Sequence, residues 1–152
     1  MDTIWFDDVE VGYIEESDPV PVDRSEMIAY ATRNDPFPIH IDPEAASQTP
    51  FGDVIASFGY VVSLLFRCNH KLQFTQAVQP SFLGALEWRV QFRKAAMGGD
   101  LLLDRMTVLS TRLASKGDRG VVTTQHELVN QDGESIVVIE VIALHLSRPA
   151  SS

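Results

Sequence analysis

The sequence predicts an α+β domain in which an antiparallel sheet of about five strands wraps around one buried helix. Two observations favour this class. Residues 53–69 are apolar on nearly every side, which is typical of a helix that is buried all round. The second half of the chain contains alternating and β-branched runs separated by turn signals. The chain has 152 residues, too few for two sizeable cores, so residues 1–152 are expected to form a single domain.

The first part of the chain is predicted to contain one edge strand and one helix. Residues 1–22 are irregular, apart from a short edge strand over residues 12–16. Asp23 is a typical helix-capping residue, and Glu26 follows it at the spacing of a capping box. The helix that begins there is expected to end near Asn34, because a proline two residues later disfavours helical geometry before it.

A loop over residues 35–42 is expected next, and two prolines stiffen it. Asp42 directly precedes Pro43, and this pair favours a helix start with the aspartate as cap and the proline in the first turn. We therefore expect a second short helix over residues 43–48.

The remaining residues are predicted to be strands. Residues 86–92 alternate apolar and polar side chains, which indicates a strand with one face in water. Residues 101–113, 121–129 and 135–146 are further β-rich runs, and Asp132-Gly133 is a hairpin signal. The covered face of the last strand is expected to carry Ile136, Val138, Ile142, Leu144 and Leu146.

The composition excludes several classes of protein. Hydrophobic residues make up 45% of the chain and charged residues 22%, so neither global disorder nor a disulfide scaffold is expected. The formal charge of -9 argues against nucleic-acid binding, although not against an anionic small molecule. The single Cys68 is interpreted as a buried structural thiol. The chain shows neither a membrane-spanning run nor a signal-peptide pattern, so we expect a cytoplasmic protein with no membrane partner.

Asp35 and His40 are the first candidates for chemistry. They lie five residues apart in the stiffened loop, so both side chains can face one cavity. Together they would hold and deprotonate a water molecule while a proton moves to a substrate carbon. The alternative is structural, with Asp35 capping backbone amides and His40 packed as a polar core residue. Adding Asp42 gives only a weak candidate metal site, since its capping role is sufficient, and no metal is expected.

Residues 55–59, Ile-Ala-Ser-Phe-Gly, are the second candidate. They lie near the start of the long helix, where free backbone N–H groups favour negative charge. Such groups would bind a thioester oxygen that becomes enolate-like in a transition state. The alternative is that Ser57 merely helps to cap the helix.

Residues 31–46, Ala-Thr-Arg-Asn-Asp-Pro-Phe-Pro-Ile-His-Ile-Asp-Pro-Glu-Ala-Ala, resemble the hydratase motif of MaoC-like dehydratases, the (R)-specific enoyl-CoA hydratase family. Residues 49–57 resemble the family's Phe-Gly-x-x-Ile-Ala-Ser approach to its central helix. Gly99-Asp100, Asp118-Arg-Gly-Val121 and the turn at 130–134 also recur in similar single-domain members. The resemblance covers residues 4–149, nearly the whole chain.

The resemblance implies a hotdog fold, in which the sheet curves around a central helix, and a homodimer or a dimer of dimers. It implies that Asp35 and His40 are catalytic and that the backbone N–H of Phe58 stabilises the oxyanion. The substrate pocket is then expected to include Phe37, Ser57, Gly59 and Tyr60.

The implied reaction is the reversible hydration of trans-2-enoyl-CoA thioesters, or the dehydration of 3-hydroxyacyl-CoA. Neither a metal nor a redox cofactor is expected, and coenzyme A enters as part of the substrate. Two alternatives share the fold. Hotdog thioesterases commonly use an acidic residue on the central helix, but residues 54–69 contain no Asp or Glu. The other alternative is a noncatalytic acyl-CoA-binding or assembly subunit.

That last alternative is motivated by two departures from the family pattern. Phe37 stands where Asn or Gln is usual, so a polar group that would orient water or substrate is lost. Phe58 stands where glycine is expected, with Gly59 one place later. Its side chain is expected to narrow the acyl pocket, while its N–H remains available.

The remaining polar residues carry weaker expectations. His70, His126 and His145 lack recognisable partners and are interpreted as structural or exposed. Five basic residues are candidates for contacts with the coenzyme A phosphates: Arg67, Lys71, Arg89, Arg93 and Lys94.

Overall fold

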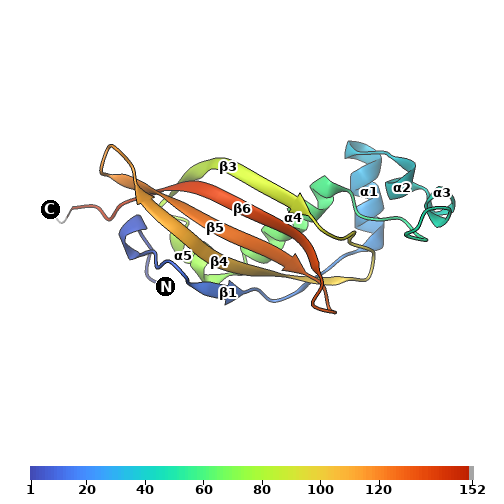
Figure 1. Cartoon of the computed structure of the whole chain (residues 1–152), viewed down its shortest axis with the longest axis horizontal. Coiled ribbons are helices and arrows are strands. Elements are labelled where there is room, and N and C mark those ends of the chain that lie inside the picture. The colour runs from blue at the N-terminus through green and yellow to red at the C-terminus, as the bar shows by residue number, and fades with distance from the viewer. Residues whose placement is uncertain (151–152) are drawn as a thin grey trace.

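The computed structural model describes residues 1–150. An antiparallel sheet with the strand order β1-β4-β5-β6-β3 curves around helix α4, which confirms the predicted α+β class (Figure 1). Its strands are β1 (Ile14–Glu16), β3 (Phe82–Phe92), β4 (Leu101–Leu113), β5 (Arg119–Val129) and β6 (Ser135–Leu146), and the short β2 (Val20–Pro21) also pairs with β4.

Helix α4 (Phe58–Asn69) forms the centre of the hydrophobic core. Its inner face packs against the sheet, where Leu102, Leu128 and Ile139 from three neighbouring strands are buried. Burying one such side chain contributes about 1.5–3 kcal/mol. This packing fixes the helix against the sheet. The buried residues of α4 are Tyr60, Val61, Leu64, Leu65 and Cys68.

Three short helices form a lobe beyond one end of the sheet (Figure 1). They are α1 (Arg24–Asn34), α2 (Pro38–Ile41) and α3 (Pro43–Ser47). Asp23 caps α1 by accepting one backbone N–H at 2.9 Å, and Asp42 caps α3 by accepting two at 3.0 and 3.2 Å. Both caps agree with the sequence prediction.

The start of α4 differs from its prediction. The helix begins at Phe58 rather than at residue 53, because the preceding segment is extended and bonded to its neighbours. The Ile55 N–H donates to the carbonyl of Ile39 at 3.1 Å, and the Ala56 N–H donates to that of Ala96 at 2.8 Å. These bonds tie the loop that carries His40 to the approach of the central helix.

Three helical segments were not predicted. Within the expected loop, Pro38 occupies the first turn of α2, where its fixed φ favours a helix. Helix α5 (Gln73–Val78) and the 3₁₀ helix η1 (Phe6–Asp8) lie at the end of the molecule away from α1–α3 (Figure 1).

The covered face of β6 also differs from its prediction. Ile136 is buried as expected, but the residues packed toward α4 are otherwise the odd-numbered ones, namely Val137, Ile139, Val141 and Ala143. Both faces of this strand are apolar, so the alternation alone does not identify the covered one.

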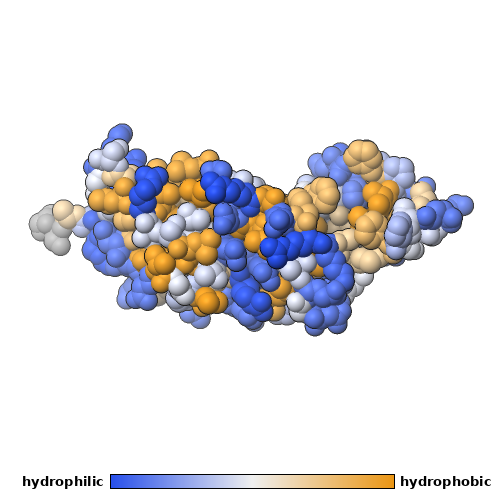
Figure 2. Space-filling model, in the orientation of Figure 1, coloured by the Kyte–Doolittle hydropathy of each residue, from blue (hydrophilic) through white to orange (hydrophobic). Residues whose placement is uncertain are grey.

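Strand β3 is an edge of the sheet and is exposed along almost its whole length. It pairs with β6 on one side, and no other strand of the described chain pairs with its second side. Trp88, Val90 and Phe92 lie on one face and are each at least one-third exposed. Figure 2 shows hydrophobic residues interspersed with hydrophilic ones on this side of the sheet, and the exposed side chains of Trp88, Val90 and Phe92 leave apolar surface uncovered on the described chain.

Candidate active site

The ring of His40 is fixed by a backbone carbonyl. The side chain is almost completely buried in α2, and its Nδ1 lies 2.8 Å from the carbonyl oxygen of Ile55. A carbonyl oxygen only accepts hydrogen bonds, so Nδ1 carries a proton and donates it. In the neutral imidazole, the Nε2 atom therefore keeps a free lone pair and is available as a base.

Asp35 faces this nitrogen. It is the first residue after α1, and its Oδ2 lies 3.6 Å from the Nε2 of His40. This separation is longer than a direct hydrogen bond. A water molecule that donates to two acceptors at about 2.8 Å each holds them roughly 4.5 Å apart. The gap is shorter than this, so a small outward movement of either side chain admits one water molecule that donates to both, and the partial exposure of Asp35 leaves the pair open to solvent.

The N-terminus of α4 lies close to this pair. Ile55, whose carbonyl binds His40, precedes Phe58 by three residues, a span of at most about 10 Å. The N-cap residue Ser57 makes no side-chain capping bond. Among residues 1–150, the N–H groups of Phe58 and Gly59 make no hydrogen bond. These two donors are free to bind an oxygen that becomes negative.

Two aromatic residues expected in the substrate pocket, Phe37 and Phe58, have exposed rings. The ring of Phe37 is 65% exposed and lies edge-on to His40, with centroids 6.5 Å apart. The ring of Phe58 is 57% exposed and stacks on Phe92 of β3 at 4.2 Å. Ser57 is completely buried, and its hydroxyl oxygen has no hydrogen-bond partner among the described residues.

Gly59 and Tyr60 pack toward α1. A methyl group at Gly59 would overlap the hydroxyl of Tyr30, and the ring of Tyr60 lies 5.6 Å from that of Tyr30. Burial raises the pKa of the Tyr60 phenol. The structure thus gives both residues a packing role, and their contact with substrate stays a prediction.

The structure brings Asp35, His40 and the N–H of Phe58 together at one end of α4. Their catalytic role stays a prediction. Within residues 1–150, no group of three or more His, Cys, Asp and Glu side chains is arranged to hold a metal ion. The same part of the chain contains no helix long and apolar enough to cross a membrane.

Several of the basic residues expected at coenzyme A are held in ion pairs. Arg67 pairs with Glu26, and Lys94 pairs with Glu134. Arg89 pairs with Glu87 at 2.9 Å and with Glu140 at 3.8 Å. All these pairs are solvent-accessible, so each is worth at most about 1 kcal/mol and is readily exchanged for a phosphate.

A buried polar cluster was not predicted from the sequence. Asp104 is 0% exposed, and its Oδ2 lies 2.8 Å from the Nδ1 of His126. The Nε2 of His126 lies 3.0 Å from the hydroxyl of Thr124. The sequence did hold a signal for this cluster, because Thr124 and His126 interrupt the apolar face of β5 between Val122 and Leu128.

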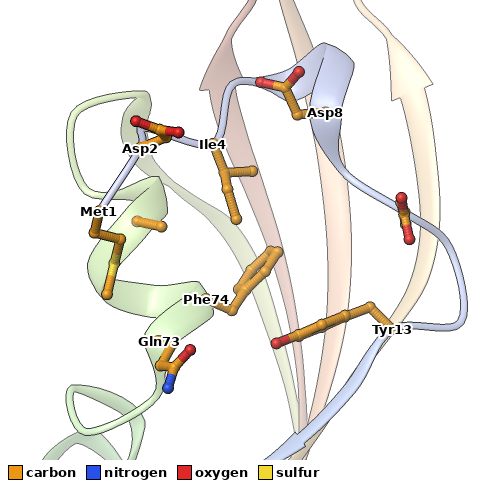
Figure 3. Close-up of a pocket in the computed structure, with 9 residues that line it drawn as sticks. Met1, Asp2, Ile4, Asp8, Tyr13, Gln73 and Phe74 are labelled. Carbon is orange, nitrogen blue, oxygen red and sulfur yellow. The ribbon is translucent and has the colours of Figure 1, made fainter.

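Two hollows lie outside the Asp35–His40 pair. The larger, about 340 Å³, lies between the N-terminal segment and α5, where Tyr13 stacks on Phe74 at 5.7 Å (Figure 3). The smaller, about 270 Å³, lies between α4, α5 and the sheet, and we call it the inner hollow. Its floor on β5 and β6 consists of Val122, Thr124, His126, Val141, Ala143 and His145.

The fold and the paired Asp and His define a domain of the hydratase and dehydratase type. The chain belongs to the MaoC-like domain family, whose model matches residues 12–131. A UPF0336 protein of Streptomyces avermitilis is 30% identical over 131 residues, which cover 80% of this chain and 81% of that protein.

Solved structures agree with this assignment. The MaoC-like dehydratase from Rhodospirillum rubrum superposes with a TM-score of 0.87 at 25% identity, over 97% of this chain and 99% of that one. The R-hydratase PhaJ1 from Pseudomonas aeruginosa superposes with a TM-score of 0.74 at 21% identity, over 99% and 96% of the two chains. The predicted hotdog fold is therefore confirmed.

Proposed function

We propose that this protein adds water reversibly to the double bond of trans-2-enoyl thioesters of coenzyme A. One observation carries this proposal: the Ile55 carbonyl fixes the proton of His40 on Nδ1 and leaves Nε2 free, 3.6 Å from Asp35. The same segment leads into the free N-terminus of α4. The proposed base, carboxylate and oxyanion donor thus belong to one connected stretch of structure, which supports the proposal.

In the proposed forward step, the water molecule donates one hydrogen to Nε2 of His40 and the other to Asp35. The Nε2 atom takes a proton as the water oxygen bonds to the β-carbon of the substrate. The electron pair of the double bond moves toward the thioester, whose oxygen becomes enolate-like. Asp35 stabilises the imidazolium, which then returns the proton to the α-carbon, so that one water molecule has been added.

The N–H of Phe58 is the proposed donor to the enolate-like oxygen. A preorganised backbone donor of this kind typically contributes 10²- to 10³-fold in rate, or about 3–4 kcal/mol. The proposed reaction requires no metal and no redox cofactor, because the thioester itself makes the α-carbon accept and release a proton. Phe37 and Phe58 are proposed to shape the entry of the acyl chain, since both rings are exposed beside the site.

The test is a panel of trans-2-enoyl-CoA thioesters, followed through the ultraviolet absorbance of the conjugated double bond. The proposal predicts loss of absorbance and a product heavier by one water molecule in mass spectrometry. Release of free coenzyme A would instead indicate a thioesterase. Thermal stabilisation by acyl-CoA with no turnover would indicate a noncatalytic binding subunit, the function favoured by the exposed ring of Phe37 against His40.

The uncovered edge supports a homodimer as the assembled form. An exposed edge strand of 11 residues is an association hazard unless it is paired or covered. We propose that β3 of one chain pairs with β3 of a second copy about a two-fold axis, which also covers Trp88 and Val90. Sedimentation should show a dimer or a dimer of dimers at micromolar concentration. A Val90→Pro exchange, which removes a backbone donor, should produce monomers, and a wild type that is entirely monomeric would contradict the proposal.

A further inference from the structure

The inner hollow has features of a second binding site. Leu65 and Phe66 of α4, Val78 of α5 and Trp88 of β3 contribute to its apolar walls. Its volume of about 270 Å³ exceeds the 150 Å³ of an apolar cavity that binds benzene. It is therefore large enough for an aliphatic or aromatic group of moderate size. None of its lining residues belongs to the Asp35–His40 pair or to the N-terminus of α4.

One end of the floor presents a hydrogen-bond acceptor without a partner. His145 is 5% exposed, and its Nδ1 lies 3.3 Å from the hydroxyl of Ser81. That hydroxyl lies 2.9 Å from the carbonyl oxygens of Ile4 and Val78, so it donates its hydrogen to one of them. It must then accept from His145, and the proton of the neutral ring resides on Nδ1.

The Nε2 atom of His145 therefore keeps a lone pair. Burial lowers the pKa of His145 to about 4, so the ring is neutral at pH 7. Among the described residues, no hydrogen-bond partner of Nε2 is found. The side chain of His145 is buried but lines the hollow, so an acceptor there without a partner in the protein favours a ligand that donates one hydrogen bond.

The other end of the floor presents a hydroxyl oxygen. Thr124 pairs with Nε2 of His126, which is itself held by Asp104. A hydroxyl has one hydrogen and two lone pairs, so the Thr124 oxygen retains an acceptor position whichever way its hydrogen points. The antiparallel register aligns Thr124 with Val141, four residues before His145. The two polar groups therefore lie about 13 Å apart, with apolar side chains between them.

These features select the chemistry of the ligand. A carboxylate would bring only acceptors to His145 and would lie in the same low-dielectric region as Asp104, so burying it is strongly unfavourable. An ammonium group would lose its hydration without a carboxylate partner on the floor. A neutral hydroxyl supplies the missing donor. We propose that the inner hollow binds an apolar group that carries a hydroxyl donor, which pairs with Nε2 of His145.

An apolar strip links this hollow to the Asp35–His40 end of α4. Phe58, Val62 and Phe66 follow one another at four-residue spacing along one face of the helix. Phe58 stacks on Phe92 at 4.2 Å, and Phe66 lies 5.3 Å from Trp88. The eight residues from Phe58 to Phe66 rise about 12 Å.

Two kinds of molecule supply such a hydroxyl group to the hollow. One is a free alcohol, and the other is the distal end of an acyl chain whose thioester lies at Asp35. An extended acyl chain has C–C bonds of about 1.5 Å and advances roughly 1.25 Å per bond because it zigzags, so it needs about eleven carbons to cross this strip. Only the acyl source rests on the proposed reaction.

Trp88 lines the hollow and serves as the reporter in a direct binding test. The chain has two tryptophans, so Trp5→Phe leaves Trp88 as the only source of tryptophan fluorescence. The probes are 1-octanol and its isomer heptyl methyl ether, which has the same atoms but no donor, at pH 7. We expect a saturable change in fluorescence and roughly fivefold tighter binding of the alcohol, as one net hydrogen bond provides.

His145→Phe should abolish the difference between the two isomers. His70→Phe, at the rim of the hollow, is the matched control and should preserve it. The quantity compared is the ratio of the two affinities within one variant. A general loss of stability weakens the binding of both ligands alike, so it leaves this ratio unchanged. Equal binding of the isomers to the wild type, no saturable binding, or discrimination that persists in His145→Phe would overturn the proposal.

Acyl-CoA thioesters then identify the source. If the ligand is the end of the acyl chain, saturated ω-hydroxyacyl-CoA of the matching length should bind tighter than the plain acyl-CoA, and 1-octanol should compete with it. If the ligand is a free alcohol, 1-octanol and acyl-CoA should bind simultaneously. Saturated thioesters cannot be hydrated, so both results support the hollow regardless of turnover. Absence of hydration would count against the proposed reaction alone.

Discussion

Gly59 sets how closely α1 approaches the start of α4, and Gly59→Ala tests this contact. A methyl group there would overlap the hydroxyl of Tyr30, and it would lie 3.3 and 3.4 Å from Cζ and Cε1 of the same ring. Such overpacking typically costs about 1–3 kcal/mol, while alanine in place of glycine within a helix returns about 1 kcal/mol. We expect a net loss of roughly 1 kcal/mol in the free energy of unfolding.

Tyr30→Phe supplies the second arm of a double-mutant cycle. The Tyr30 hydroxyl has no hydrogen-bond partner among the described residues, so its removal alone should change stability by less than about 0.5 kcal/mol. In the double variant, only the two ring-carbon contacts remain, and small adjustments relieve them. The gain of about 1 kcal/mol from alanine then remains, so we expect the double variant to be at least as stable as the wild type, which gives a coupling energy of about 1–2 kcal/mol.

Urea unfolding of the four proteins measures this coupling directly. The contact also bears on function, because α1 leads directly into Asp35 and the glycine lies next to the Phe58 donor. Gly59→Ala should therefore lower the rate of hydration more than it changes substrate binding, and Tyr30→Phe should restore the rate. Stability changes that simply add, within about 0.3–0.5 kcal/mol, would refute the reasoning.

Three further predictions concern single residues. Phe37→Asn should retain hydration and shift the preference toward longer or more polar acyl groups, since the exposed ring lies beside His40; identical specificity constants across a chain-length series would contradict this. Burial raises the pKa of the Cys68 thiol to about 11, so a thiol reagent at pH 7 should modify it only after unfolding, and rapid modification of the native protein would argue otherwise. The pKa of His145 falls from 6.5 to about 4 on folding. The stabilisation that this difference gives to the folded state is therefore complete above pH 6.5 and is lost as the pH falls toward 4. It amounts to about 3 kcal/mol, and the difference in unfolding free energy between wild type and His145→Phe should follow this pH range.

Local patterns predicted much of the architecture. The caps at Asp23 and Asp42 fixed the starts of two helices, because capping depends on residues adjacent in the chain. The β-rich runs at residues 101–113 and 135–146 predicted β4 and β6 with their observed bounds. The proline-stiffened loop and its resemblance to the family predicted that Asp35 and His40 lie together.

Long-range contacts account for the features that the sequence predicted wrongly or did not predict. Ile55 belongs to an apolar run that favours a helix, but its hydrogen bonds to Ile39 and His40 hold it extended, and neither bond is visible in local sequence. The covered face of β6 depends on where α4 packs, because both faces of the strand are apolar. The Asp104–His126 pair joins two strands 22 residues apart, so its geometry emerges only from the register of β4 and β5.

The most direct measurement of the central claim compares hydration of trans-2-enoyl-CoA by wild type, Asp35→Asn, His40→Ala and the double variant. If the two side chains hold one water molecule, each single exchange should lower the specificity constant by roughly 10²- to 10⁴-fold. The double variant should be little worse than either single variant, because effects within one catalytic unit do not add. Circular dichroism should show that all four proteins are folded. Hydration by the folded Asp35→Asn or His40→Ala variant at a rate comparable to wild type would contradict the account.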